Sequence, residues 1–310
     1  MKLLKKITTT FENLTSLEDS HRRKSATHPG QFSLRDWRIA IVETMNAIGA
    51  KNVGILSAGI AYFTTLAFFP LMAAAVAIAA FVINDSQLQD IVHNLEVYLP
   101  ADIASLISAQ LKSALGNSSA NMIVAVIAIL LSLFSVSGAT QNVITATNII
   151  YERKESRNFI KLRIRSLILT AGLLVTGFIV IALLLIDEGL LHHLGIPEII
   201  VVVVPYIRWV ILAALVTIGM AVFYRYGPDR KNPKWQWVSS GAVIATLVWL
   251  LGTTLFFIYA RFFASFSDTY SLFAGIIVLM TWLNLTAFTI LLGAVINHRL
   301  EDRTVRRTTH

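Results

Sequence analysis

Six long runs of apolar residues alternate with shorter polar segments along the chain. Each run exceeds the roughly 20 residues that an α-helix needs to cross the hydrocarbon core of a bilayer. The pattern therefore predicts an all-α fold, a polytopic membrane protein built as a six-span helical bundle. The predicted spans cover about 52–83, 121–150, 166–187, 199–224, 237–263 and 271–297.

Two polar segments outside the spans also have apolar residues at helical spacing. Residues 1–51 end in a stretch that predicts an amphipathic helix at the membrane surface. Its apolar stripe consists of Trp37, Ile41, Met45 and Ile48. Residues 84–120 have helical spacing on both sides of Pro100, which predicts a helical hairpin packed on the outer ends of the spans. Residues 298–310 form a basic tail.

Basic residues collect in alternate connections. Lys and Arg number 9 up to the start of span one, 6 between spans two and three, 4 between spans four and five, and 4 after span six, which is 23 of 26. The positive-inside rule therefore predicts that both termini are cytoplasmic. This explains the net charge of +8 better than nucleic-acid binding does, and it suits anionic lipid head groups. The candidate head-group contacts are Arg153, Lys154, Arg157, Lys161, Arg163 and Arg165.

Composition excludes several classes of site. Only 14% of the 310 residues are charged, whereas soluble domains have about 25%. There is no cysteine, so disulfides and thiolate sites are excluded. The chain has no phosphate-binding loop, no H-E-x-x-H pair and no G-x-S-x-G turn. We therefore expect no enzymatic activity, no cofactor and no metal. The polar first fifty residues also lack the apolar core of a cleaved signal peptide.

Span one contains two residues that a simple anchor does not need, Tyr62 and Pro70. Proline removes a backbone donor and clashes with the preceding turn, so a kink or a break is expected at Pro70. One interpretation is that span one is the central packing helix of the bundle. The other is that it bends beside a cavity that Tyr62 faces.

Span two has a polar stripe at helical spacing, which consists of Ser137, Gln141, Thr145 and Asn148. Because hydrocarbon offers no hydrogen-bond partners, the deeper members Ser137 and Gln141 need partners within the protein or water. Hydrogen bonding between helices and the lining of a hydrated path both explain the stripe.

Two further polar residues lie inside predicted spans. Arg208 lies about nine residues into span four, where a charge costs at least ~2.5–3.5 kcal/mol at the bilayer centre. It is a candidate substrate contact. The alternative is that it snorkels to the outer head groups or pairs with Glu198 or Asp187. Asn284 lies near the middle of span six, and a hydrogen bond between helices is the simpler interpretation of it.

Four groups of residues stand out as a set. The first is Ala58-Gly59-Ile60-Ala61-Tyr62 with Phe69-Pro70, and the second is Asn148 and Tyr151 ahead of Glu155-Ser156-Arg157. The third is RYGPDRKNPKWQWVSSGAVIAT with Trp249, Phe256 and Tyr259, and the last is Thr269-Tyr270, Trp282 and Leu292-Gly293-Ala294 with Asn297. In this order they resemble the signatures of the YihY/BrkB family of membrane proteins, some of which were catalogued as ribonuclease BN. The chain departs from the family pattern at Ser271, usually glycine, and at Val295, usually a carboxylate.

The resemblance implies a six-span protein of the bacterial inner membrane, described in the family as a transporter or as a factor in envelope integrity and virulence. Our leading hypothesis is a transporter or lipid translocation factor for an amphiphilic or anionic substrate. Its candidate path consists of Tyr62, Pro70, Ser137, Gln141, Arg208 and Asn284. The alternative is a scaffold that organises an envelope complex through the hairpin. Membrane lipids are the expected partners, and the oligomeric state is left open.

Overall fold

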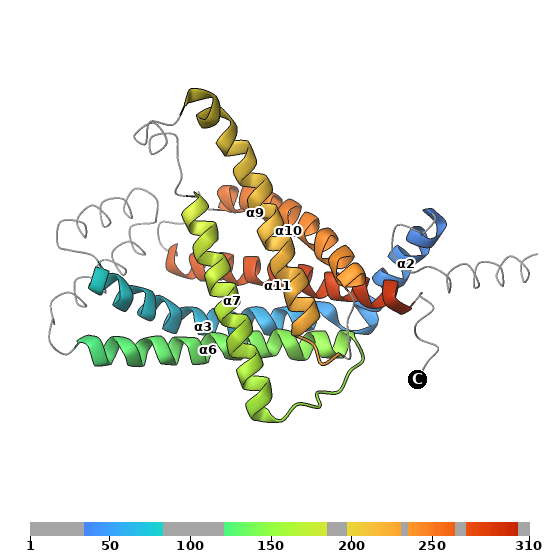
Figure 1. Ribbon diagram of the computed structural model, residues 1–310. Helices are drawn as coiled ribbons and strands as arrows, with labels where there is room; N and C mark the ends of the chain where they lie inside the picture. The colour runs from blue at the N-terminus through green and yellow to red at the C-terminus, as the bar shows by residue number, and fades with distance from the viewer. Residues whose placement is uncertain (1–33, 83–120, 185–196, 231–234, 264–270, 303–310) are drawn as a thin grey trace, which may run out of the picture.

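The computed structural model in Figure 1 describes residues 34–82, 121–184, 197–230, 235–263 and 271–302, which are predominantly helical. Six of the seven helices in these ranges, all except α2, are long and apolar enough to cross a membrane, which confirms the predicted all-α polytopic fold. The predicted hairpin at 84–120 lies outside the described residues. The helices are α2 (Leu34–Ala50), α3 (Val53–Val82), α6 (Asn121–Ile150), α7 (Phe159–Leu184), α9 (Glu198–Tyr226), α10 (Trp235–Phe263) and α11 (Ser271–Asp302).

Helix α11 is the hub of the bundle, since it packs against α10, α3, α2 and α6. Figure 1 shows the axes of α3, α6 and α11 roughly aligned, with α7 and α9 crossing them steeply. Helix α7 begins at Phe159, seven residues before the predicted start of span three at 166. The third helix therefore includes basic residues that the sequence pattern assigns to a loop.

The closest helix packing occurs where α9, α10 and α11 meet. A Cβ added at Gly293 would overlap the hydroxyl of Tyr224 and lie 2.8 Å from the Cβ of Ala245. At Gly241 the backbone nitrogen donates to Oδ1 of Asn297 at 2.9 Å, and a Cβ there would overlap the same amide. These two glycines therefore let α10 and α11 approach closely, as small residues do in membrane helix pairs.

Helix α3 continues through Pro70 from Val53 to Val82, so the proline does not end it. Tyr62 is 51% exposed, and its ring packs edge-on against Phe63 at 5.4 Å between centroids. Tyr62 thus lies on the outside of the described bundle. Its predicted place in a substrate path stays a prediction.

Helix α2 contacts α11 and α3 along a side of small residues that includes the buried Ala40 and Ala47. Its larger side chains Ile41 and Met45 are exposed. A helix with one packed side and one exposed apolar side suits a position at the membrane interface.

Candidate functional site

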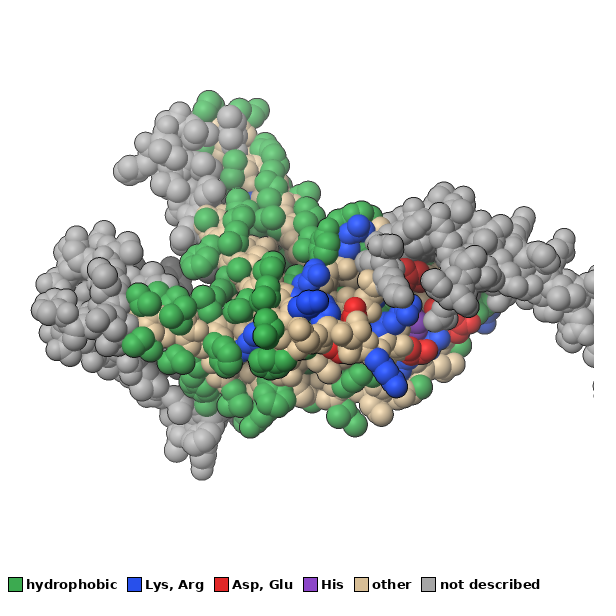
Figure 2. All heavy atoms as spheres, turned by 60° about the horizontal axis from the view of Figure 1, so that its bottom comes forward, with side chains coloured by type: hydrophobic (Ala, Val, Ile, Leu, Met, Phe, Trp, Pro, Cys, Tyr) green, Lys and Arg blue, Asp and Glu red, His purple; other side chains and the backbone are tan. Residues whose placement is uncertain are grey.

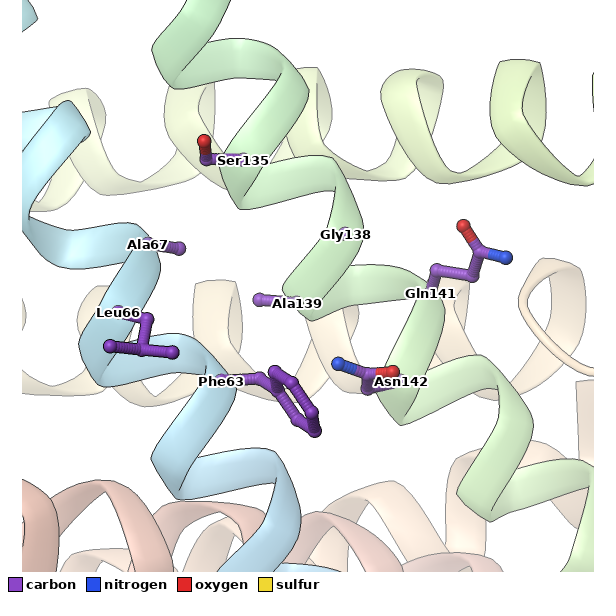
Figure 3. A pocket seen from close by; sticks show the side chains of 8 residues that line it. All are labelled: Phe63, Leu66, Ala67, Ser135, Gly138, Ala139, Gln141 and Asn142. Atoms are coloured by element: carbon purple, nitrogen blue, oxygen red, sulfur yellow. The ribbon is translucent and has the colours of Figure 1, made fainter.

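A groove of about 390 Å³ runs along the membrane domain between α3 and α6. Figure 3 shows Asn142 of α6 facing Phe63 of α3 across it, while Gln141 projects away from α3. The floor is formed by small and polar residues of α6, and the α3 wall is largely apolar. The lining residues are Phe63, Leu66, Ala67, Ser135, Gly138, Ala139, Gln141 and Asn142.

The groove lies far along α6 from the end of that helix at Ile150. Gln141 lies nine residues before the end of α6 at Ile150 and Ser135 lies fifteen before it, which correspond to about 14 Å and about 22 Å of helix. The hydrocarbon core of a bilayer is about 30 Å thick. Polar groups of the groove therefore lie well inside the membrane domain, where few partners other than protein exist.

Arg163 of α7 is not one of the residues that line the groove, but it contacts Gln141, which is. Its Nη2 donates to the carbonyl oxygen of Phe134 at 2.7 Å, and its Nη1 donates to Oε1 of Gln141 at 3.4 Å. The guanidinium carbon also lies 3.7 Å from the centroid of the Phe134 ring, a cation–π geometry. A Cβ at Gly138 would lie 3.8 Å from Nη1, so the missing side chain leaves room for the guanidinium.

The charge of Arg163 has no acidic partner in the described part of the chain. The ion pairs among those residues do not include it. Its Nε is buried and makes no hydrogen bond there. The guanidinium remains protonated because arginine does not deprotonate in proteins. A cation compensated only by a carbonyl, an amide and a ring can still bind an anion.

The sequence pattern predicts lipid head-group contact for Arg163 and a place in the substrate path for Gln141, and the structure brings the two side chains together. Ser137 is fully buried and donates to the Phe134 carbonyl of its own helix at 2.8 Å. The hydroxyls of Thr140 and Thr170, 2.7 Å apart, form a further hydrogen bond between α6 and α7.

The other candidates lie away from the groove. Arg208 is half-buried on α9. Asn284 is half-buried on α11, and its Oδ1 makes no hydrogen bond among the described residues. Among the basic residues near the loop, Arg153, Lys154 and Lys161 are exposed and Arg165 is half-buried. Neither Arg208 nor Asn284 lines the groove, and their proposed roles remain predictions.

Sequence reasoning missed the α3 wall and the part of the floor formed by Ser135, Gly138 and Asn142. These three residues recur at i, i+3 and i+7, so they share one face of α6. Their spacing was visible in the sequence, but two of them are small or weakly polar. Only the approach of α3 shows that they line a groove.

The connection after α6 is held to the turn after α9 by a hydrogen-bonded network. Nδ2 of Asn148 donates to Glu155 at 2.8 Å, and its Oδ1 accepts from the backbone nitrogen of Asp229 at 2.7 Å. Asp229 also accepts from the backbone nitrogen of Ser156 at 2.7 Å. Arg157 donates to Glu155 at 2.6 Å and to the carbonyl of Gly227 at 3.0 Å.

Two ion pairs at the same end join the α2–α3 connection to the connection after α6, and the turn after α9 to α11. Lys51 donates to Glu152 at 2.9 Å, and Arg230 pairs with Glu301. We call this region the packed end, and it comprises residues Lys51, Asn148 to Arg157, Tyr224 to Arg230, Gly241, and Gly293 to Asp302. In Figure 2 the charged side chains of the described residues gather toward one end, and apolar side chains cover much of the rest.

The carboxylates of the packed end have lowered pKa values. The hydrogen bond from Arg157 lowers the pKa of Glu155, and the hydrogen bond from Lys51 lowers that of Glu152. Burial raises the pKa of Asp229, but hydrogen bonds from Ser156 outweigh it and the net shift is downward. These groups are therefore ionised and paired near neutral pH.

Burial raises the pKa of the Tyr151 hydroxyl to about 12, so it stays protonated. The Arg230 guanidinium carbon lies 4.2 Å from the centre of the Tyr151 ring. The tyrosine of the second sequence signature is therefore a packing residue at this end.

Comparisons with known proteins support the resemblance seen in the sequence. The family model described as "Virulence factor BrkB" matches residues 44–310. A protein named as ribonuclease-like, YfkH of Bacillus subtilis (strain 168), is 31% identical over 253 residues, covering 80% of this chain and 90% of its own length. The UPF0761 membrane protein IL2447 of Idiomarina loihiensis (strain ATCC BAA-735 / DSM 15497 / L2-TR) is 30% identical over 97 residues, 31% of this chain and 34% of that protein. No solved structure matches. The chain belongs to the BrkB virulence factor family of membrane proteins.

Proposed function

We propose that this protein moves an anionic amphiphile through or along the membrane, as a transporter or a lipid translocation factor of the cell envelope. The observation that carries the proposal is the groove between α3 and α6, together with the Arg163 guanidinium that bonds to Gln141 of its lining. A volume of about 390 Å³ lies within the roughly 300–1,000 Å³ of small-molecule sites.

The arrangement of polar and apolar surface supports a substrate with both characters. Phe63 and Leu66 on the α3 wall are each 49% exposed, and they offer apolar surface to a hydrocarbon chain. Gln141 and Asn142 on the floor offer amide donors. A charged residue inside a membrane span is a functional candidate by default because its cost there must be offset.

The packed end supports an orientation for this movement. Its basic residues follow the positive-inside rule, which favours an inner-membrane protein with both termini in the cytoplasm. The groove would then open to the bilayer, and Arg208 on α9 would offer a second charge toward the other side. The scaffold alternative depends on residues 84–120, and no observation on the described residues favours it.

Reconstitution tests the proposal. Purified protein is placed in liposomes with a phosphatidylglycerol labelled by a nitrobenzoxadiazole dye, and dithionite then reduces the label in the outer leaflet. We expect the reducible fraction to exceed the outer-leaflet share found in protein-free liposomes. The Gly138→Leu variant should give a smaller reducible fraction than the parent, since leucine would fill the groove beside Arg163. Equal reducible fractions with parent protein and without protein, for the anionic lipid and for other amphiphiles, would contradict the proposal.

A further inference from the structure

We propose that the groove between α3 and α6 binds the phosphate head group of an anionic membrane lipid against Arg163, with a lipid chain along the α3 wall. This inference names the substrate class and rests on the proposed function.

The first argument is the spare donor capacity of Arg163. A guanidinium has five N–H donors, and Arg163 uses one toward Phe134 and one weakly toward Gln141. Its Nε is buried without a partner among the described residues. Because Nε is buried, the donors left for a phosphate are the remaining N–H groups of Nη1 and Nη2.

The second argument is charge. No carboxylate of the described residues forms an ion pair with Arg163. The carbonyl of Phe134 and the amide of Gln141 neutralise only part of a full positive charge. In a medium of low dielectric constant, an anion in contact with the guanidinium would gain more than it does in water.

The third argument separates a lipid from free phosphate. The α3 wall of the groove includes Phe63 and Leu66, which are about half exposed, and Phe69 one turn further along α3 is exposed as well. Free phosphate would leave this surface uncovered. A phospholipid would place its phosphate at Arg163, its glycerol region near Asn142 and a chain along α3.

Arg163 belongs to α7, four residues after its start at Phe159, and it reaches α6 at a distance from the end of that helix. Its contacts with α6 lie between Phe134 and Gln141, nine to sixteen residues from Ile150, or about 14–24 Å along the helix. An ordinary head group lies outside the hydrocarbon core. A head group bound beside these contacts would lie inward of the end of α6, as a step of translocation requires.

Native mass spectrometry of the detergent-purified protein tests the inference. Phosphatidylglycerol and phosphatidylcholine with identical chains are added to the parent and to the variants Arg163→Gln, Arg163→Lys and Arg225→Gln. Arg225 is the matched control because it also stacks on aromatic rings, 4.6 Å from that of Trp235, and it lies outside the groove. The parent and Arg225→Gln should retain phosphatidylglycerol in preference to phosphatidylcholine.

Arg163→Gln should weaken retention of phosphatidylglycerol about tenfold or more, the scale of a hydrogen bond to a charged group. Arg163→Lys keeps the charge without the paired donors and should retain an intermediate preference. Equal retention of the two lipids by the parent, or an unchanged preference in Arg163→Gln, would overturn the inference. Displacement of the lipid by millimolar inorganic phosphate would overturn the choice of a lipid as occupant.

The inference and the proposed function fail separately in the paired experiments. Selective, Arg163-dependent retention by a parent protein that moves no lipid in liposomes supports the binding site and contradicts the transport proposal. Movement of lipid that Arg163→Gln leaves unchanged, together with loss of selective retention, supports the site and places transport elsewhere. Movement without any selective retention in the parent overturns the inference alone.

Discussion

Positively charged side chains have different partners at the packed end and at the groove. At the packed end, Arg157 lies against Glu155, Arg230 against Glu301, and Lys51 against Glu152. At the groove, Arg163 contacts a backbone carbonyl, an amide oxygen and an aromatic ring. Arginine paired with a carboxylate stabilises a fold, whereas arginine left with neutral partners retains the capacity to bind an anion.

The packed end and the groove also differ in how tightly their residues pack. At Gly293 a methyl group would collide with the Tyr224 hydroxyl and the backbone of Gly241, whereas at Gly138 it would make ordinary contact with Arg163. The packed end thus has no room for a methyl group at Gly293, whereas the groove has room for one at Gly138. A region without spare volume is suited to hold helices together, and a region with room is suited to admit a ligand.

The largest expected effect comes from placing the same methyl group in each region. Gly293→Ala should destabilise the protein by about 1–3 kcal/mol or more, as overpacking of tight contacts does. Gly138→Ala should leave stability unchanged or raise it slightly, because alanine favours helix by about 1 kcal/mol over glycine. Thermal unfolding in detergent measures both. Equal losses of stability in the two variants would show that the groove is as tightly packed as the packed end.

The next effect comes from removing one arginine from each region. Arg157→Met leaves Glu155 without its ion-pair partner and should cost about 1.5–3 kcal/mol, the value of charged hydrogen bonds. Arg163→Met leaves only neutral groups behind and should change stability by less than about 1 kcal/mol, since replacing a buried charge by an apolar side chain is often neutral. A loss in Arg163→Met as large as that in Arg157→Met would make Arg163 a structural residue.

The smallest effect is the dependence of stability on pH. The pKa values of Glu155, Glu152 and Asp229 are lowered in the folded protein, so their stabilisation is present above the unfolded values of about 4. It is lost as the pH falls through the lower folded values. Thermal unfolding between pH 3 and 7 should therefore show a decline below about pH 4 that is reduced in Glu155→Gln.

The same acid titration separates the two regions. The unfolding temperature of Arg163→Met should decline with falling pH in parallel with that of the parent, because no carboxylate of the described residues pairs with Arg163. A shallower decline in Arg163→Met would reveal an acidic group coupled to the groove.

The sequence predicted the fold because a helix that crosses a bilayer needs a long apolar run, and such runs are visible one segment at a time. It also predicted that Gln141 needs a partner. It did not predict that Arg163 is this partner, because that contact depends on where α7 crosses α6. The basic pattern around Arg163 resembles an ordinary cytoplasmic loop, and the early start of α7 at Phe159 places this residue in a helix.

Asn148 and Glu155 illustrate a similar gap. Both belong to a signature of the family, yet spacing along the chain does not show that they bond to each other and to the turn at Asp229. Asp229 is 81 residues from Asn148. Contacts across such separations depend on how the helices dock, which apolar periodicity does not specify.

Crosslinking of lipid to single cysteines tests most directly whether the groove selects an anionic lipid. The native chain has no cysteine, so two single-cysteine variants can be compared without background labelling. One is Leu66→Cys in the groove, and the other is Leu247→Cys at an exposed position of α10. Phosphatidylglycerol and phosphatidylcholine, each with a maleimide on one chain, would be the reagents. The groove site predicts that Leu66→Cys reacts faster with the anionic reagent, that Arg163→Gln abolishes this preference, and that Leu247→Cys shows none. Equal rates for the two reagents at Leu66→Cys, or a preference that survives Arg163→Gln, would contradict it.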